Sequence, residues 1–219
     1  MAARAGADFV GLNFCATSSR YVGERDVAAL LAAVESPAVP VAVTVNATKK
    51  LLEQLTRGGG LIGPRPFPVI QLHGDEPPAL ADWVIERGTK VIKAFHVAGP
   101  DFAGPISDWL AEVRNPAGLL AILLDTLDPA APPGRRFGGT GKRFNWEWIA
   151  QAREAGLFEG WPPLMLAGGL APSNITKAVR IARPWGVDVA GGVEVEDSPG
   201  IKSIDRIRDF IRNARVGGL

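Results

Sequence analysis

The chain has 219 residues, of which 47% are hydrophobic, with a formal net charge of +1 and a single cysteine. This composition allows one domain with a sizeable core, and the balanced charge argues against nucleic acid or an anionic membrane as a partner. One cysteine excludes an internal disulfide and a cysteine-based zinc site. No apolar run reaches the ~20 residues of a membrane helix and the N-terminus lacks a signal-peptide layout, so we expect a cytoplasmic protein.

The first half of the chain alternates short apolar runs with helical patterns. The opening residues resemble the end of a helix that Gly6 closes as a C-cap. From residue 24, Val27, Leu30, Leu31 and Val34 recur at helical spacing. Strands are predicted at residues 9–14, 39–45, 69–72 and 90–96, and further helices at residues 49–57 and 78–87.

The second half continues the same alternation. A stripe formed by Ile106, Trp109, Leu110 and Val113 predicts a helix before the next apolar run. Strands are then predicted at residues 119–124, 164–167 and 187–190, and helices at residues 145–155, at 175–182 and from Ser203 onward. Strands that are continuous apolar runs, each followed by a helix, indicate a parallel sheet covered by helices.

The expected fold is therefore α/β, a TIM (β/α)₈ barrel formed by residues 1–219 as one phosphate-binding domain. Seven strands are predicted, and an eight-stranded barrel typically takes ~250 residues, which leaves a shortfall of about one βα unit of roughly 30 residues. We expect that the first strand and most of the first helix are missing from this sequence. A seven-stranded doubly wound sheet is the alternative.

The stretch around Asp125 has the layout of an α/β active site. A buried strand ends in this carboxylate, and a loop with Gly139, Thr140 and Gly141 follows. Partial desolvation at a strand end would raise the pKa of the carboxyl toward that of a proton donor. A carboxylate that caps its own loop by binding backbone N–H groups is the alternative.

Two glycine pairs end the last two predicted strands: Gly168 with Gly169, and Gly191 with Gly192. Glycines let backbone N–H groups approach an anion closely, and barrel enzymes often bind a phosphate between the loops after strands seven and eight. Either pair alone could be no more than a tight turn. Two pairs on successive strand ends favour a phosphate site.

Read together, these segments resemble the phosphoribosylanthranilate isomerase family of tryptophan biosynthesis. The matching segments, in the family's order, are GAD and GLNF at residues 6–14, SRYV at 19–22, QLHGDE at 71–76, LLD at 123–125, GGTGK at 138–142, LAGGL at 166–170, GVE at 192–194 and PGIK at 199–202. The resemblance implies a (β/α)₈ barrel without cofactor or metal. It also implies an Amadori rearrangement of a phosphosugar substrate.

The resemblance also implies roles for individual residues. Asp125 would be the general acid, and Arg20 would pair with the anthranilate carboxylate, which suits its bidentate guanidinium. His73 would contact substrate or line the pocket. Asp188 would either orient substrate or satisfy buried backbone groups. His96 has no match in the family and is expected to be structural.

The general base has no match in this sequence. The family uses a cysteine at the end of its first strand, in a Lys-x-Cys-Gly motif, and the chain contains no such motif. Cys15 does not match that cysteine, because it follows the strand that corresponds to the second strand of the family. A small buried or half-buried thiol is therefore the favoured interpretation, and a displaced base is the alternative.

Two other functions compete with this isomerase. Indole-glycerol-phosphate synthase has a similar glycine pattern, but it would need lysine and glutamate at strand ends, and only Lys93 fits. A catalytically inactive or fragmentary phosphosugar-binding barrel is the other possibility. The sequence indicates a monomer or a homodimer without deciding between them.

Overall fold

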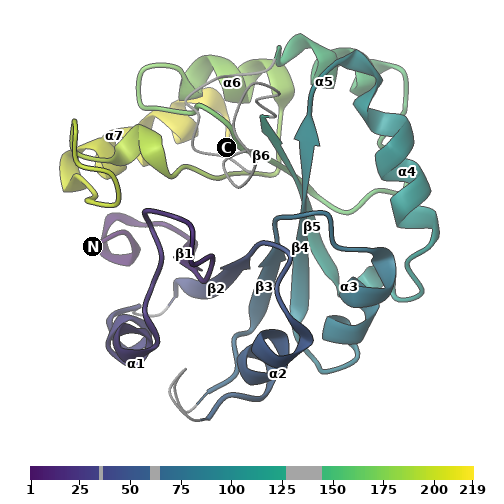
Figure 1. Ribbon diagram of the computed structural model, residues 1–219. Coiled ribbons are helices and arrows are strands. Elements are labelled where there is room, and N and C mark those ends of the chain that lie inside the picture. The colour runs from purple at the N-terminus through teal and green to yellow at the C-terminus, as the bar shows by residue number, and fades with distance from the viewer. Residues whose placement is uncertain (35–36, 60–64, 127–144) are drawn as a thin grey trace. The chain divides into compact units, whose positions relative to one another are not determined.

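The structure is a computed structural model that describes residues 1–34, 37–59, 65–126 and 145–219. The chain divides into two compact units, one formed by residues 1–93 and 112–120 and the other by residues 94–111 and 121–219. Each unit is a parallel sheet with helices, and strands and helices alternate along the whole chain from the purple to the yellow end (Figure 1). The predicted βα alternation is confirmed.

The first unit contains the strands β1 to β3 and β4 as far as Lys93, in chain order in the sheet. Its elements are η1 (Ala3–Ala5), β1 (Phe9–Asn13), α1 (Glu24–Ala33), β2 (Val39–Thr44), α2 (Lys49–Arg57), β3 (Val69–Leu72), α3 (Pro78–Ile85), β4 (Lys90–Val97) and η4 (Pro116–Gly118). The opening residues form a single 3-10 turn, and Gly6 closes it with a φ of 93°. The predicted C-cap is therefore correct.

The second unit continues the sheet order from the end of β4 through β7. Its elements are η3 (Pro100–Phe102), α4 (Ala103–Ala111), β5 (Leu119–Thr126), α5 (Glu147–Glu154), β6 (Leu164–Leu166), α6 (Ile175–Ala182), β7 (Gly186–Val187), η5 (Gly191–Val193) and α7 (Ile204–Gly217). Helix α6 packs against both α5 and α7. Among the described residues, no helix is long and apolar enough to cross a membrane.

The central strands are buried on both faces, as their continuous apolar sequences predict. All four residues of β3 are buried, and so are seven of the eight residues of β5. These strands are buried because helices with an apolar face alternate with them along the chain and cover the sheet. Burial at ~25 cal/mol per Å² of apolar surface is the main stabilising contribution of these layers.

Strand register brings the loops that follow the strands to one edge of each sheet. In the first unit Thr44 pairs with Leu72, and Leu72 pairs with Lys93. In the second unit Leu124 pairs with Leu166, and Leu166 with Val187. Because all pairs are parallel, the residues that come directly after these positions lie together at the carboxyl edge of their sheet.

The last strand is shorter than predicted. Residues 187–190 were expected to be extended, but β7 ends at Val187, and Asp188 lies just beyond it. Its backbone N–H still donates to the carbonyl oxygen of Leu166 over 2.9 Å. A strand that ends early leaves more chain for the turn that carries Gly191 and Gly192.

Candidate active site

Asp125 lies near the end of β5, in the second unit, and only 6% of its surface is exposed. Its Oδ1 accepts a hydrogen bond from the backbone N–H of Thr126 over 2.7 Å. Both alternatives in the sequence analysis, a desolvated acid and a carboxylate that binds backbone N–H groups, therefore describe part of the same environment. A carboxylate has two oxygens that can each accept hydrogen bonds, so one local donor does not use its whole accepting capacity.

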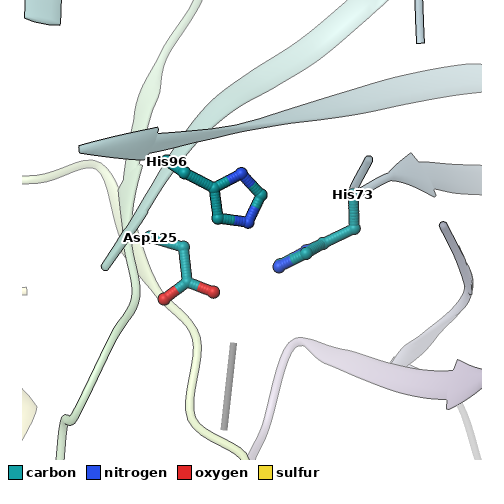
Figure 2. A group of neighbouring side chains, drawn as sticks. All are labelled: His73, His96 and Asp125. Carbon is teal, nitrogen blue, oxygen red and sulfur yellow. The ribbon is translucent and has the colours of Figure 1, made fainter. Parts of the chain in front are cut away.

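His96 lies beside Asp125 at the end of the neighbouring strand β4. Figure 2 shows the two side chains projecting into the same region from the ends of their strands, and their possible ligand atoms lie within 4.8 Å of each other. The sequence offered no role for His96 beyond structure, because its neighbour comes from a segment almost thirty residues away. Only the register of parallel strands places an imidazole next to this acid. These two side chains alone are too few for a tetrahedral metal site.

Gly168 and Gly169 lie in the loop that follows β6. Gly168 and Gly169 have φ values of 86° and 60°, a conformation that side chains rarely adopt. A Cβ on Gly168 would overlap the hydroxyl of Thr126. The loop after β6 is therefore pressed against the end of β5, next to Asp125.

The glycines after β7 pack on the loop after β6. A Cβ on Gly192 would overlap the backbone carbonyl oxygen of Leu170. The two predicted glycine pairs are thus brought together, as their positions on successive strand ends indicated. Close packing of two glycine turns is a backbone arrangement that can surround an anion with N–H groups.

Three polar side chains that the sequence analysis did not select hold these two turns. Asn174 donates from Nδ2 to the carbonyl of Gly169 over 2.9 Å. Lys202 donates from Nζ to the carbonyl of Ala190 over 2.7 Å. Arg206 donates from Nε and Nη2 to the carbonyl of Gly192 over 3.2 and 3.1 Å. The PGIK motif that ends in Lys202 was the one available signal for this arrangement.

In the first unit, the loop after β1 contains Arg20, which is half-buried. Ser18 orders this loop, because its Oγ accepts from the backbone N–H of Arg20 over 3.1 Å and lies 3.4 Å from Nδ2 of Asn13. Cys15 is half-buried, and its Sγ lies 3.2 Å from the hydroxyl of Thr17. These contacts fit the favoured interpretation of Cys15 as a small local thiol.

His73 follows β3 and is buried, with Nδ1 2.6 Å from Nε2 of Gln71. Its backbone N–H donates to the carbonyl of Thr44 over 2.8 Å. Since the amide nitrogen of Gln71 donates, Nδ1 of His73 accepts, and the ring proton of the neutral form lies on Nε2. His73 is therefore a buried, hydrogen-bonded histidine after a strand end, and its contact with substrate stays a prediction.

A buried ion pair holds the loop that follows His73. Glu76 and Lys93 lie 3.1 Å apart with side chains 1% and 2% exposed. Lys93 also donates to the carbonyl of Gly74 over 2.6 Å, and Glu76 accepts from the N–H groups of Gly74 and Asn46 over 2.9 and 2.8 Å. We call these four residues the Glu76–Lys93 network. Burial lowers the pKa of Lys93 below its ordinary value, although Glu76 partly opposes this.

Asp188 is half-buried directly after β7, on the same edge as the glycine turns. The predicted substrate-loop residues Gly139, Thr140 and Gly141 lie outside the described residues. The second unit therefore brings together Asp125, Asp188 and both glycine pairs, while the first unit contains Arg20 and His73.

These features define the class of protein. Parallel strands that alternate with helices, a buried acid at a central strand end and two packed glycine turns are typical of phosphate-binding α/β-barrel enzymes. The described residues contain seven of the eight strands of such a barrel. The predicted fold class is confirmed by the comparisons that follow.

The family described as N-(5'phosphoribosyl)anthranilate (PRA) isomerase matches residues 1–213. The chain is 40% identical over 212 residues to the N-(5'-phosphoribosyl)anthranilate isomerase of Myxococcus xanthus, an alignment that covers 96% of this chain and 87% of that protein. It therefore belongs to the PRA isomerase family, as the motifs predicted.

Solved structures agree with this assignment. The chain is similar to phosphoribosyl anthranilate isomerase from Thermotoga maritima, with a TM-score of 0.76, 32% identity, and 98% and 91% of the two chains covered. It is also similar, with a TM-score of 0.73, 30% identity, and 98% and 90% coverage, to a phosphoribosyl anthranilate isomerase in complex with reduced 1-(o-carboxyphenylamino)-1-deoxyribulose 5-phosphate. These matches favour the isomerase over indole-glycerol-phosphate synthase.

Proposed function

We propose that this chain converts N-(5-phosphoribosyl)anthranilate to 1-(2-carboxyphenylamino)-1-deoxyribulose 5-phosphate, a step of tryptophan biosynthesis. Membership of the PRA isomerase family supports the reaction. The observation that supports it on this chain is the buried Asp125 at the end of β5, next to two packed glycine turns. An acid and an anion site on one edge are what this phosphosugar chemistry requires.

The reaction moves protons and needs no cofactor. The general acid protonates the ring oxygen, the C1–O bond breaks, and a Schiff base forms between C1 and the anthranilate nitrogen. A base then removes the proton from C2, which gives an enolamine that tautomerises to the ketone. Asp125 serves as the acid, since its buried carboxyl lies near the end of β5 beside the glycine turns.

The remaining site residues bind and orient. Gly168, Gly169, Gly191 and Gly192 present backbone N–H groups to the phosphate. Asp188, on the same edge, orients the sugar, and His96 lies where it can hold the Asp125 carboxyl in one orientation.

The aromatic end of the substrate needs a cation for its carboxylate. Arg20 supplies a planar fork for that group, and His73, whose ring proton lies on Nε2, contacts the substrate through it. Gly139, Thr140 and Gly141 remain the predicted substrate loop. The single cysteine supports a cytoplasmic location, and the assembly is a monomer or a homodimer.

Replacement of the acid tests the proposal. Asp125→Asn keeps the size of the side chain but removes its acidic proton, so we expect turnover to fall about 10²-fold or more with a smaller change in KM. Asp108→Asn is the matched control, because Asp108 is exposed on α4 in the same unit. Steady-state isomerase kinetics on the three proteins, with melting temperature measured beside them, make the comparison.

Three outcomes separate the alternatives. Unchanged turnover in Asp125→Asn would remove this residue from the acid role. Equal losses in Asp125→Asn and Asp108→Asn would point to a general effect of charge. A wild-type chain that binds the reduced product analogue without turnover would instead be a phosphosugar-binding protein.

A further inference from the structure

Two basic side chains grip the turn of residues 190–193, which carries the second glycine pair. Lys202 binds the carbonyl of Ala190 and, over 3.0 Å, the Oε1 of Glu194. Arg206, in the first turn of α7, directs two N–H donors to the carbonyl of Gly192. Both cations thus bind backbone oxygens, although carboxylates are their more usual partners. A third contact, the packing of Gly192 on Leu170, fixes the turn from another side.

The geometry of the peptide bond explains what such a grip does. In a trans peptide the C=O and the N–H of one unit point in opposite directions. A cation that holds the carbonyl of Ala190 therefore also sets the direction of the Gly191 N–H. The cation on the carbonyl of Gly192 sets the direction of the Val193 N–H in the same way.

Glycine makes this grip necessary. Gly191 and Gly192 have no Cβ to limit their backbone angles, so the turn would otherwise populate several conformations. Only the conformation with N–H groups directed at the anion would bind phosphate, and affinity falls by the fraction of the time that the turn spends elsewhere. Side chains that hold the carbonyls increase that fraction before substrate arrives.

Charge acts in the same direction. A backbone carbonyl oxygen near a phosphate is repulsive, and a cation bound to that oxygen offsets its partial charge. Lys202 and Glu194 balance each other, with side chains 34% and 9% exposed. Arg206 contributes the remaining positive charge beside the turn.

We propose that Lys202 and Arg206 are positioning residues, which hold the 190–193 turn in its anion-binding conformation and so set the affinity for the phosphate of the substrate. This inference rests on the proposed function and adds two residues to it. Neither side chain takes part in proton transfer, so their loss should change phosphate affinity and leave the chemical step intact.

Arg206→Gln is the primary test, because Arg206 is exposed and its loss leaves no buried charge unpaired. We expect KM for the phosphorylated substrate to rise about fivefold, the effect of one exposed charge-assisted contact, with kcat within about twofold of wild type. Inorganic phosphate, used as a competitive inhibitor, should bind more weakly by the same factor. Anthranilate, which has no phosphate, should inhibit both proteins equally.

Arg208→Gln is the matched control. Arg208 lies on the same helix and pairs with Asp205 over 3.7 Å, so its loss removes the same charge without touching the turn. Arg206→Lys retains the charge but not the two donors of the guanidinium, so its KM for the phosphorylated substrate should lie between those of wild type and Arg206→Gln. Lys202→Gln should weaken phosphate binding too, with an additional loss of stability because the ion pair between Lys202 and Glu194 is lost.

The outcomes are distinct. Equal rises in KM for Arg206→Gln and Arg208→Gln would overturn positioning in favour of general electrostatics. A lower melting temperature and kcat for Arg206→Gln with unchanged phosphate inhibition would overturn it in favour of a purely structural contact. Absence of isomerase activity in wild type would contradict the proposed function instead, and phosphate binding measured by calorimetry would still test the role of Arg206.

Discussion

The loop after β3 and the turn after β7 are both held by cations, but these cations are buried in the first region and partly or largely exposed in the second. Each holds an irregular backbone at a strand end, and each uses a lysine bound to a carbonyl oxygen. In the Glu76–Lys93 network the two charges are almost fully buried, and they bind each other and backbone groups of the protein. In the 190–193 turn the cations are partly or largely exposed to water.

This difference in burial determines how rigidly each region holds its backbone conformation. A buried pair is costly to desolvate and strongly destabilising to break, so it holds one backbone conformation under most conditions. Exposed cations gain less, are screened by salt and can move. The first arrangement suits a loop that keeps one conformation beside His73, and the second suits the proposed role of the 190–193 turn, which is to admit and release a phosphate.

The largest expected effect comes from breaking the buried pair. Glu76→Ala would leave the Lys93 ammonium buried without its carboxylate, and we expect the free energy of unfolding to fall by about 3–5 kcal/mol. Urea unfolding measures the loss. The double variant Glu76→Leu with Lys93→Met should recover much of it, because it removes both charges.

Glu53→Ala is the control for this prediction. Glu53 pairs with Arg57 over 2.9 Å on the exposed face of α2, where the side chains are 42% and 69% exposed. Loss of such a pair should cost at most about 1 kcal/mol. Similar losses for Glu76→Ala and Glu53→Ala would contradict the contrast between the two regions.

A second prediction concerns the glycine turn itself. Gly192→Ala would force a Cβ into the carbonyl of Leu170, so the two turns must separate. We expect a loss of up to about 3 kcal/mol in stability, together with a higher KM for the phosphorylated substrate. Thermal unfolding and steady-state kinetics measure these effects.

Gly104→Ala provides the comparison for that substitution. Gly104 lies in α4 of the same unit, and a Cβ there meets no atom within 4 Å. Because alanine favours a helix over glycine by up to about 1 kcal/mol, this variant should be neutral or more stable. A Gly192→Ala protein as stable and as active as Gly104→Ala would show that the turns tolerate separation.

Asp82 is a buried carboxylate with an exposed partner, and its replacement should change the free energy of unfolding least among these predictions. It is buried in α3, while its partner Arg114 is 73% exposed. Burial alone would raise the pKa of Asp82, but the backbone N–H groups of Arg114 and Asn115 and the Arg114 guanidinium lower it below its ordinary value. The carboxylate therefore stabilises the folded state above the unfolded pKa of ~3.9 and loses this contribution as pH falls through the folded pKa.

Asp82→Asn tests that sign. We expect it to lower the free energy of unfolding at pH 7 by about 1–2 kcal/mol, and the gap from wild type should narrow as pH drops below about 4. Urea titrations at a series of pH values measure the gap. A gap that stays constant with pH would show that the charge of Asp82 contributes nothing.

Much of the fold could be predicted because its signals are local. Solid apolar runs such as β3 and β5, each followed by a helical stripe, specify strands and helices independently of what they later contact. The boundary of β7 was less predictable. Val189 continues the apolar alternation, but β7 ends at Val187, and the glycine turn that follows packs on the loop after β6.

The site was predictable where a residue type and a strand end coincide. Asp125 and both glycine pairs were selected this way, and the structure places them after strand ends of the second unit, while their roles stay predictions. His96 and Arg206 were missed because each lies beside a segment from another part of the chain, and Asn174 was missed although Gly169 is only five residues away. In the sequence, nothing distinguishes these three side chains from polar residues that simply face solvent.

By itself, the sequence determined the alternation of parallel strands with helices, the PRA isomerase family and the strand that ends in the acid. Only the tertiary structure decided which side chains face that acid and which cations hold the glycine turn. The physical reason is that apolar periodicity is a property of neighbouring residues, whereas a hydrogen bond between Arg206 and Gly192 exists only after α7 has packed beside the turn.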